Sequence, residues 1–297
     1  MLQLDCFAAS TQKEIYAMTD GRRLYERAAS QDRGADSLWH LDATRTLFVG
    51  PLHYNGVHQH GAPVFLAGLY GPFGLRVNGG AWLTCRTAVI PAGVVHELNI
   101  GGNPIAVLYI EPNGVGFDAL APLVGNSCET NGVLIGSTGE IGPMRALYED
   151  HSSLQWMESA LIDLVGFGRR RARKAMDLRV AHAVEIMRDC HNDLTLVSKL
   201  AGEVGLSASR FQHLFTDDVG VPFRRYRAWA RMRTAIAEIV AGSNFTTAAH
   251  AAGFSDQAHF ARDFRRTFGA PASVSLSKVR RPEARQGATS RKIDLRP

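Results

Sequence analysis

The stretch Gly253–Gly269, GFSDQAHFARDFRRTFG, reads as a glycine turn followed by a helix. Ser255 or Asp256 can cap this helix, because a short side-chain oxygen there accepts a backbone N–H group that has no partner within the helix. Three phenylalanines recur every four residues and so share one face: Phe260, Phe264 and Phe268. The pattern predicts a helix that packs into a core through its phenylalanines.

A different face of the same helix collects two small residues and two arginines: Ala258, Ala261, Arg262 and Arg265. Small residues let a helix approach a surface closely, and arginine binds phosphates and guanine edges. Taken alone, the stretch fits either an ordinary surface helix with a solvated basic face or a helix that reads DNA.

The same arrangement occurs 49 residues earlier in the chain. The corresponding positions are Phe211 with Phe260, Phe215 with Phe264, Ala201 with Ala249, and Gly205 with Gly253. Each unit therefore has a small residue in a first helix, a glycine turn and a second helix that is anchored by phenylalanines. A small residue lets two helices cross closely, which a helix-turn-helix requires. Two such units in tandem favour DNA reading over a solvated surface helix.

From residue 175 onward the sequence predicts only helices and turns. The predicted helices are 176–190, 194–204, 208–217, 222–241, 246–252 and 256–268, with Ser207 as the cap of the third. The long helix 222–241 joins the two units, and its apolar residues are expected to be buried: Tyr226, Trp229, Met232, Ile236 and Val240. Its arginines are expected to be exposed: Arg224, Arg225, Arg227, Arg231 and Arg233.

The net charge of +5 conceals an asymmetry between the two halves of the 297-residue chain. Residues 166–297 carry 24 Lys and Arg against 12 Asp and Glu, a balance of +12, whereas residues 1–165 carry 9 against 16, a balance of −7. An acidic half and a basic half indicate two domains with different partners. The basic half is a candidate for binding a polyanion.

The sequence shows no signal peptide and no apolar run long enough to span a membrane. Four scattered cysteines, Cys6, Cys85, Cys128 and Cys190, fit reduced thiols rather than a disulfide framework. Together these features favour a cytoplasmic location.

The first half becomes rich in glycine between residues 58 and 111. Short apolar runs at 64–69, 75–77, 87–90 and 105–110, separated by turn signals, predict an antiparallel sandwich or barrel. The fragments HQH, with His58 and His60, and PAGVVHELN, with His96, resemble the two motifs of the cupin barrel. Cupins bind a metal through these histidines and a glutamate that follows HxH, and here that glutamate is missing. Three imidazoles could still hold Zn²⁺ or Fe²⁺, but a pocket without a metal or cofactor is favoured.

Residues 176–275 resemble the DNA-binding domain of AraC/XylS family transcription regulators. The resemblance rests on LAGEVGLSASRFQHLF, VPFRRYRAWARMRTA and AAHAAGFSDQAHFARDFRRTFG, and the cupin-like half completes the domain order of that family. The resemblance implies a cupin-like β-barrel with helices, followed by an all-α domain with two helix-turn-helix motifs. The expected boundaries are 1–165 for the effector and dimerisation domain, 166–175 for a linker, 176–276 for the DNA-binding domain and 277–297 for a disordered tail.

The resemblance also implies two recognition helices in successive major grooves of double-stranded DNA, with RNA polymerase as a further partner. Residues expected to face bases are Ser209, Gln212 and His213 in the first helix and Gln257, Ala258, Ala261 and Arg262 in the second. Residues expected at phosphates are Arg210, Arg265 and Arg266. The effector pocket is expected at His58, His60 and His96, with Phe65 and Trp82 as apolar walls.

Residues 144–165 are predicted to be helical, with an apolar face formed by Leu154, Met157, Leu161, Leu164 and Val165. This face could pack on the barrel or pair with a second copy in a homodimer. No catalytic activity is predicted. The alternative hypothesis is a metal-dependent cupin enzyme fused to the DNA-binding part.

Overall fold

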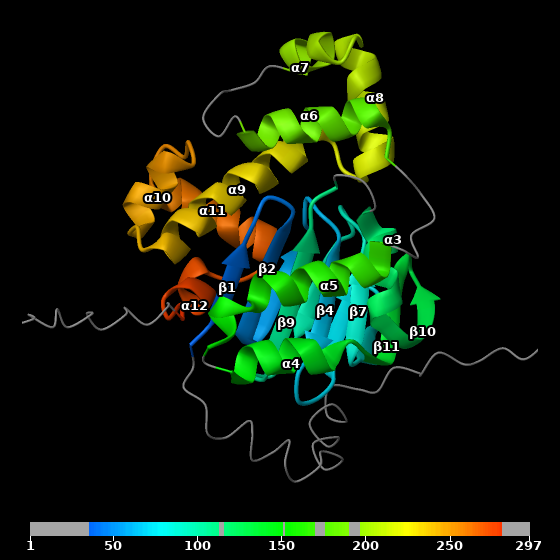
Figure 1. The fold of residues 1–297 in the computed structure, drawn as a ribbon, viewed down its shortest axis with the longest axis vertical. Helices are drawn as coiled ribbons and strands as arrows, with labels where there is room; N and C mark the ends of the chain where they lie inside the picture. Colours follow the sequence, from blue (N-terminus) through cyan, green and yellow to red (C-terminus); the bar gives the residue numbers. More distant parts are fainter. Residues whose placement is uncertain (1–35, 113–115, 151, 170–175, 190–196, 281–297) are drawn as a thin grey trace, which may run out of the picture.

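The computed structural model describes residues 36–112, 116–150, 152–169, 176–189 and 197–280. A part built of strands with helices against it is followed by a part built only of helices (Figure 1), which confirms the predicted fold class. Residues 170–175 of the expected linker and residues 281–297 of the expected tail lie outside the described residues.

The described strands form two antiparallel sheets. The larger sheet has, in spatial order, β1 (Leu38–Leu41), β2 (Arg45–Pro51), β9 (Pro104–Ile110), β4 (Val64–Gly68), β7 (Thr87–Ile90), β11 (Val133–Gly139) and β10 (Val124–Thr130). The smaller sheet has β3 (Tyr54–His58), β8 (His96–Asn99), β5 (Phe73–Val77) and β6 (Trp82–Cys85). Each of the four apolar runs predicted to be strands falls on one of these elements.

Alternate residues of the larger sheet serve two separate cores. In β4, Val64 and Leu66 join a core inside the barrel, whereas Phe65 and Ala67 join a core on the opposite face. Successive side chains of a strand point to opposite faces, so a strand that is covered on both sides reads as a continuous apolar run. This explains why every residue of β4 is buried.

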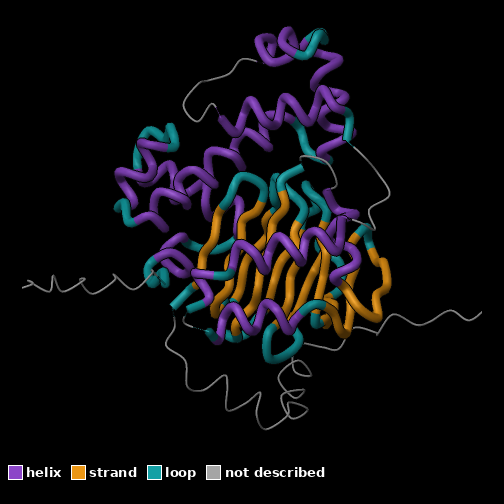
Figure 2. Tube along the Cα trace, in the orientation of Figure 1, coloured by secondary structure: helices purple, strands orange, loops and turns teal. Residues whose placement is uncertain are grey.

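Helices α3 (Gly116–Leu120), α4 (Ile141–Glu149) and α5 (Met157–Arg169) cover the outer face of the larger sheet, as Figures 1 and 2 show. The predicted helix 144–165 is therefore two helices. They are separated at Asp150, whose carboxylate accepts hydrogen bonds from the backbone of Ser152 at 2.8 Å and from the indole of Trp156 at 2.7 Å. The apolar face of α5 packs against the sheet of its own chain, which decides between the two alternatives in favour of the barrel.

The hairpin of β10 and β11 was not anticipated, although its turn carries a recognisable signal. Asn131 and Gly132 both have positive φ, of 50° and 75°. A two-residue Asn-Gly turn of this kind matches the right-handed twist of the flanking strands.

The second half contains α6 (Leu178–Asp189), α7 (Val197–Glu203), α8 (Ala208–Val219), α9 (Phe223–Ala241), α10 (Phe245–Ala251), α11 (Gln257–Phe268) and α12 (Ala272–Leu276). Each helix predicted in this half coincides with one of α6 to α11, and α12 is an addition. Pro222 is the N-cap of α9, where its missing N–H costs nothing. None of the described helices combines the length and apolar content needed to cross a membrane.

The start of the expected tail is ordered against the first half, which corrects that expectation for residues 277–280. The backbone N–H of Ser37 donates to Lys278 at 2.7 Å, and that of Arg280 donates to Ser37 at 2.8 Å. The Arg280 guanidinium donates to the Tyr148 carbonyl at 2.8 Å. Backbone hydrogen bonds to Ser37, just before β1, therefore hold residues 278–280 in place. The polar composition of the tail does not predict this pairing.

Candidate DNA-reading surface and ligand cavity

Two helix-turn-helix units, which we call head 1 (α7 and α8) and head 2 (α10 and α11), repeat the same local chemistry. Gly205 and Gly253 make the turns with φ of 67° and 75°, values that glycine adopts without strain. Ser207 caps α8 by accepting from the Arg210 N–H at 3.3 Å. Asp256 rather than Ser255 caps α11, accepting from the His259 N–H at 2.7 Å.

The phenylalanines that define the repeat are buried in both heads: Phe211, Phe215, Phe260 and Phe264. In head 1 the rings of Phe211 and Phe215 lie 5.6 Å apart and both contact Phe223 at the start of α9. In head 2, Phe260 contacts Phe254. The phenylalanines therefore belong to the core and set the angle of each second helix.

All ten residues expected to contact DNA are exposed: Ser209, Arg210, Gln212, His213, Gln257, Ala258, Ala261, Arg262, Arg265 and Arg266. The Gln257 carboxamide accepts from the Thr246 hydroxyl at 3.0 Å, which ties its orientation to α10. Arg266 donates to Asp263 at 3.0 Å. The two exposed faces have the composition that groove reading needs, and the contacts themselves remain predictions.

The expectation that all five arginines of α9 are exposed is wrong for three of them. Arg224 and Arg225 are exposed, whereas Arg227, Arg231 and Arg233 are partly buried. Arg231 donates to the carbonyls of Ala252 and Gly253 at 3.2 and 2.7 Å and stacks over the Phe254 ring at 4.3 Å. Arg233 points the other way, into the first half of the chain. Helical periodicity separates apolar from polar positions, but it does not show that another domain covers a polar one.

A buried carboxylate, Glu111, holds α9 against the barrel. It accepts from the Tyr226 hydroxyl at 2.6 Å and the Trp229 indole at 2.9 Å, and it forms an ion pair with Arg233 at 3.1 Å. The Glu111 side chain is 4% exposed. We call this set of four residues the Glu111 latch.

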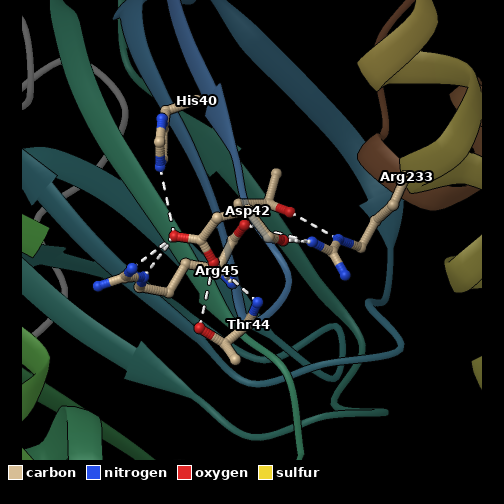
Figure 3. Close-up of polar contacts among 6 residues, drawn as sticks. His40, Asp42, Thr44, Arg45 and Arg233 are labelled. Atoms are coloured by element: carbon tan, nitrogen blue, oxygen red, sulfur yellow. Dashed lines mark hydrogen bonds and ion pairs between the residues drawn. The ribbon is translucent and has the colours of Figure 1, made fainter. Parts of the chain in front are cut away.

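Arg233 extends the latch to the turn between β1 and β2, as Figure 3 shows. Its guanidinium donates to the Thr46 hydroxyl at 2.8 Å and also to the Asp42 carbonyl. Burial alone would raise the pKa of the Asp42 carboxyl, but hydrogen bonds from His40, Arg45 and Thr44 outweigh it and hold that pKa below its usual range. The Asp42 carboxylate is itself paired with Arg45 at 2.6 Å. The turn therefore offers Arg233 a carbonyl and a hydroxyl as acceptors rather than a free carboxylate.

Head 2 makes a further contact with the barrel through the C-terminal end of α11. The Asn55 carboxamide donates to the Phe268 carbonyl at 2.8 Å, and the Gly56 N–H donates to the Gly269 carbonyl at 2.9 Å. Gly269 has φ of 72°, and a Cβ there would lie 2.3 Å from the Gly56 carbonyl oxygen. Only glycine allows strand β3 and the end of α11 to approach this closely.

A cavity of about 40 Å³ lies where the barrel meets head 2. Its barrel wall is formed by Trp39, Phe48, Leu52, Asn55, His58, His60, Leu66, Leu98, Val107 and Tyr109. Its other wall comes from the end of α11 and from α12: Phe264, Phe268, Ala270, Val274 and Ser275. The cavity is therefore closed by the same segment that ends α11, the second helix of head 2.

Three of the five residues expected in the pocket lie together, and two lie elsewhere. His58 and His60 line the cavity, and His58 faces His96 across β3 and β8 in the strand register. Phe65 points to the opposite face of its sheet, into the core beneath α5. Trp82 lies on β6, stacked under Arg76 at 5.0 Å, outside the cavity. The sequence identifies alternation along a strand but not which alternate set faces inward.

The three histidines are neutral in this environment. Burial lowers the pKa of His58 to about 4 and that of His96 to about 3, against partial compensation from backbone carbonyls. Burial, together with the other two rings, lowers the pKa of His60 well below its usual range. The cavity wall thus offers imidazole nitrogens and no charge at neutral pH.

Comparison with known proteins agrees with this arrangement. A family model for a helix-turn-helix domain matches residues 200–277, from within α7 of head 1 to the end of α12. The ToxT structure from Vibrio cholerae strain SCE256, bound to an unsaturated fatty acid, superposes with a TM-score of 0.56 at 14% identity, covering 81% of this chain and 97% of that one. ToxT from Vibrio cholerae O395 gives 0.53 at 12% identity, covering 80% and 99%. No curated protein sequence matches the chain.

Two helix-turn-helix units on one joining helix, preceded by a β-domain that carries a cavity, define a DNA-binding transcription regulator. Residues 200–277 therefore match a helix-turn-helix domain family, and most of the chain shares its fold with ToxT.

The sequence left unassigned several residues that matter for this arrangement: Asn55, Glu111, Tyr109, Phe268 as a cavity wall, and Gly269. For Glu111 the sequence does contain one indication of its role, because this residue directly follows the apolar run of β9. A charged residue at the end of a buried strand is a candidate for a buried partner, but the partner is more than 100 positions away in the sequence.

Proposed function

We propose that both heads read successive major grooves of one operator, and that a small apolar molecule in the cavity controls head 2. The observation that carries the proposal is the shared wall of the cavity: ten lining residues come from the barrel and five from the end of α11 and α12. A molecule bound there touches the sensing domain and the DNA-reading domain at once.

The DNA part of the proposal follows from the exposed faces of α8 and α11. Successive major grooves on one side of DNA recur every 34 Å or so, and α9 sets the separation of the two heads. Gln212 is suited to adenine and Arg262 to guanine, while Ala258 and Ala261 can meet a thymine methyl group. Because α8 and α11 carry different residues at equivalent positions, the two halves of the site differ in sequence.

The chemistry of the wall indicates the class of effector. Among the fifteen lining residues, eleven are apolar or aromatic and the other four are Asn55, His58, His60 and Ser275. None of these fifteen carries a charge at neutral pH. A largely apolar, uncharged molecule with one polar group directed at the histidines fits this lining.

The size of the cavity indicates how the effector acts. A volume of 40 Å³ holds about three waters, which is far less than a typical ligand pocket of roughly 300 Å³ or more. An effector larger than a few atoms must push the end of α11 and α12 away from the barrel. Binding energy is thereby converted into a change in the position of head 2.

The likeness in fold to a ToxT structure that is bound to an unsaturated fatty acid supports a small-molecule effector. The proposal includes the absence of catalysis, action in the cytoplasm, contact with RNA polymerase and a homodimer. Because the inner face of α5 is covered by the sheet, a second copy would have to meet its outer face, where Ile162 is 52% exposed. If sedimentation at micromolar concentration detects only monomer, the homodimer proposal is wrong.

The DNA part is tested by selecting sites from a random DNA library with the full chain, and then measuring binding of the selected site by fluorescence anisotropy. We expect a site with two different halves one helical turn apart. Selection with Arg262→Ala should relax the bases in one half only. A single short site, or an unchanged preference in that variant, would contradict two-headed reading.

The effector part is tested with two matched substitutions. Val274→Trp narrows the cavity from the α12 side, and Val57→Trp adds the same side chain at an exposed position of β3 outside the lining. Apolar compounds that raise the melting temperature of the wild type should stabilise Val57→Trp equally and Val274→Trp much less. Equal stabilisation of both variants would show that effectors bind elsewhere.

A further inference from the structure

Three buried imidazoles face one another beside the cavity: His58, His60 and His96. Their ring centroids are 4.2 Å apart for His58 and His96, 4.8 Å for His58 and His60, and 4.9 Å for His60 and His96. One nitrogen from each ring lies within 4.8 Å of the other two. We call this group the histidine triad.

The hydrogen bonds of two of these rings fix which nitrogen is free. The Nδ1 atom of His58 lies 2.6 Å from the Gly56 carbonyl, and that of His96 lies 2.9 Å from the Val94 carbonyl. A carbonyl can only accept, so each Nδ1 carries the proton and each Nε2 presents a lone pair. A backbone carbonyl on Nδ1–H is a common way of orienting a histidine that binds a metal through Nε2.

Unpaired nitrogens remain in the triad. Among the described residues, Nε2 of His96 and Nδ1 of His60 are buried and have no hydrogen-bond partner. The Nε2 atom of His60 is 3.4 Å from the Tyr109 hydroxyl, which is a long contact. Buried polar atoms are normally paired, so two unpaired nitrogens within a cluster of three imidazole rings indicate a shared ligand.

The nearby carboxylate is not available to this ligand. Glu97 follows His96 on β8 and faces the other side of its sheet, where it accepts from the Tyr54 hydroxyl at 2.5 Å and the Arg76 guanidinium at 2.7 Å. The donor set is therefore three neutral imidazoles. Imidazole suits zinc, iron, nickel and copper, whereas magnesium and calcium prefer oxygen.

We propose that His58, His60 and His96 bind one divalent transition-metal ion, Zn²⁺ in the first instance, with a fourth position open to the cavity. Tetrahedral zinc with Zn–N bonds of 2.0–2.1 Å places its ligand nitrogens about 3.4 Å apart, so the rings close in by small rotations. The open position takes water or a donor atom of a bound molecule. The ion lies next to head 2, because the His60 ring contacts Trp229 and Phe268 at 6.4 and 5.9 Å.

This site goes beyond the proposed effector response and stands whether or not an organic effector exists. It departs from the sequence-based expectation of a pocket without metal, which rested on the glutamate missing after HQH. Three imidazoles with a fourth open position already form a complete zinc site of a common kind.

The test uses the full chain, purified without a histidine tag and treated with a chelator. Zn²⁺ binding is measured by calorimetry, and Co²⁺ is added as a spectroscopic probe because tetrahedral Co²⁺ absorbs visible light strongly. We expect one ion per chain and a tetrahedral Co²⁺ spectrum. Absence of stoichiometric Zn²⁺ binding, or of that spectrum, in the wild type would overturn the site without any variant.

Variants then locate the ion. His96→Ala and His60→Ala should weaken Zn²⁺ binding by at least the 10–100-fold that loss of a supporting residue around a metal typically produces. His53→Ala and His213→Ala, at exposed histidines, are the matched controls and should bind as the wild type does. Wild-type affinity in the triad variants overturns the proposal. Circular dichroism checks their folding, and if they fail to fold, X-ray absorption of the wild-type Co²⁺ complex decides by counting imidazole ligands.

Discussion

The two heads have the same local design and different attachments. Head 1 packs on α6 and α9, and its loop after α8 meets the barrel where Val221 approaches Gly93. Head 2 closes the cavity with Phe264 and Phe268, and the carbonyls of Phe268 and Gly269 accept hydrogen bonds from the Asn55 side chain and the Gly56 N–H of β3. Sequence repetition therefore gives two heads of similar design, whereas the contacts outside the repeat place only head 2 against the cavity.

The largest effect is expected from breaking the Glu111 latch. Glu111→Ala leaves the Arg233 cation, whose side chain is 13% exposed, without its carboxylate and removes the acceptor of Tyr226 and Trp229. Removal of one partner from a buried ion pair costs about 3–5 kcal/mol. The free energy of unfolding, measured by urea denaturation, should fall by that amount. Glu129→Ala, at an exposed position of β10, should change it by less than about 0.5 kcal/mol.

A result for Glu111→Ala as small as for Glu129→Ala would show that α9 does not depend on the barrel. Limited proteolysis sharpens the test, because a released helical half should be cleaved from the barrel faster in Glu111→Ala only.

The latch also shows where prediction from sequence ends. The heads were predictable, because phenylalanines at a spacing of four and a 49-residue repeat are local patterns. Strands β4, β7 and β9 were predictable because turn residues bound their apolar runs. Arg233 was placed on an exposed face because helical periodicity contains no information about a surface supplied by residues 42–46, almost 190 positions away.

The histidine triad lies between these cases. Period-two spacing predicts His58 and His60 on one face of a strand. Both line the cavity, but β3 ends at His58 and His60 lies just beyond it. That His96 lies opposite His58 depends on the register of β3 and β8, which includes an irregularity between Asn55 and His58. Phe65 was misplaced for a related reason, since β4 is buried on both faces and its sequence does not distinguish them.

The second prediction applies one substitution to equivalent positions of the two heads. Gly220 and Gly269 are both left-handed C-caps, of α8 and α11. An alanine pays about 1–2 kcal/mol for that conformation at either position. At Gly220 the nearest atom to a new Cβ is 3.5 Å away, but at Gly269 the Gly56 backbone is 2.3 Å away.

Gly269→Ala should therefore destabilise the protein clearly more than Gly220→Ala, and it should separate the end of α11 from β3. Hydrogen exchange at the Gly56 amide, which donates to Gly269, should accelerate in Gly269→Ala and stay unchanged in Gly220→Ala. If the two variants lose equal stability and show equal exchange at Gly56, the contact between the end of α11 and β3 does not contribute to the stability of the protein.

The third prediction compares base reading. Arg262 in head 2 corresponds to His213 in head 1, and both are exposed. Arg262→Ala should cost roughly 1–3 kcal/mol of DNA binding and relax specificity at one base pair. His213→Ala should relax a different base pair, about one helical turn away. Competition binding against single-base variants of the selected site measures both. Relaxation at the same base pair would contradict separate reading by two heads.

The smallest effect is expected at a phosphate contact. Arg265 is exposed on α11, and the equivalent position of α8 is Thr216. Arg265→Thr gives head 2 the residue that head 1 carries, so it should weaken binding to all DNA sequences alike and reduce the slope of log affinity against log salt by about 1. Gln257→Ala is the control, because a neutral side chain that faces bases should alter specificity and leave the salt slope unchanged. A change of base preference in Arg265→Thr would place Arg265 in the groove and shift the reading face of α11 by about one turn. The two heads would then differ in how they lie on DNA as well as in how they are attached to the barrel.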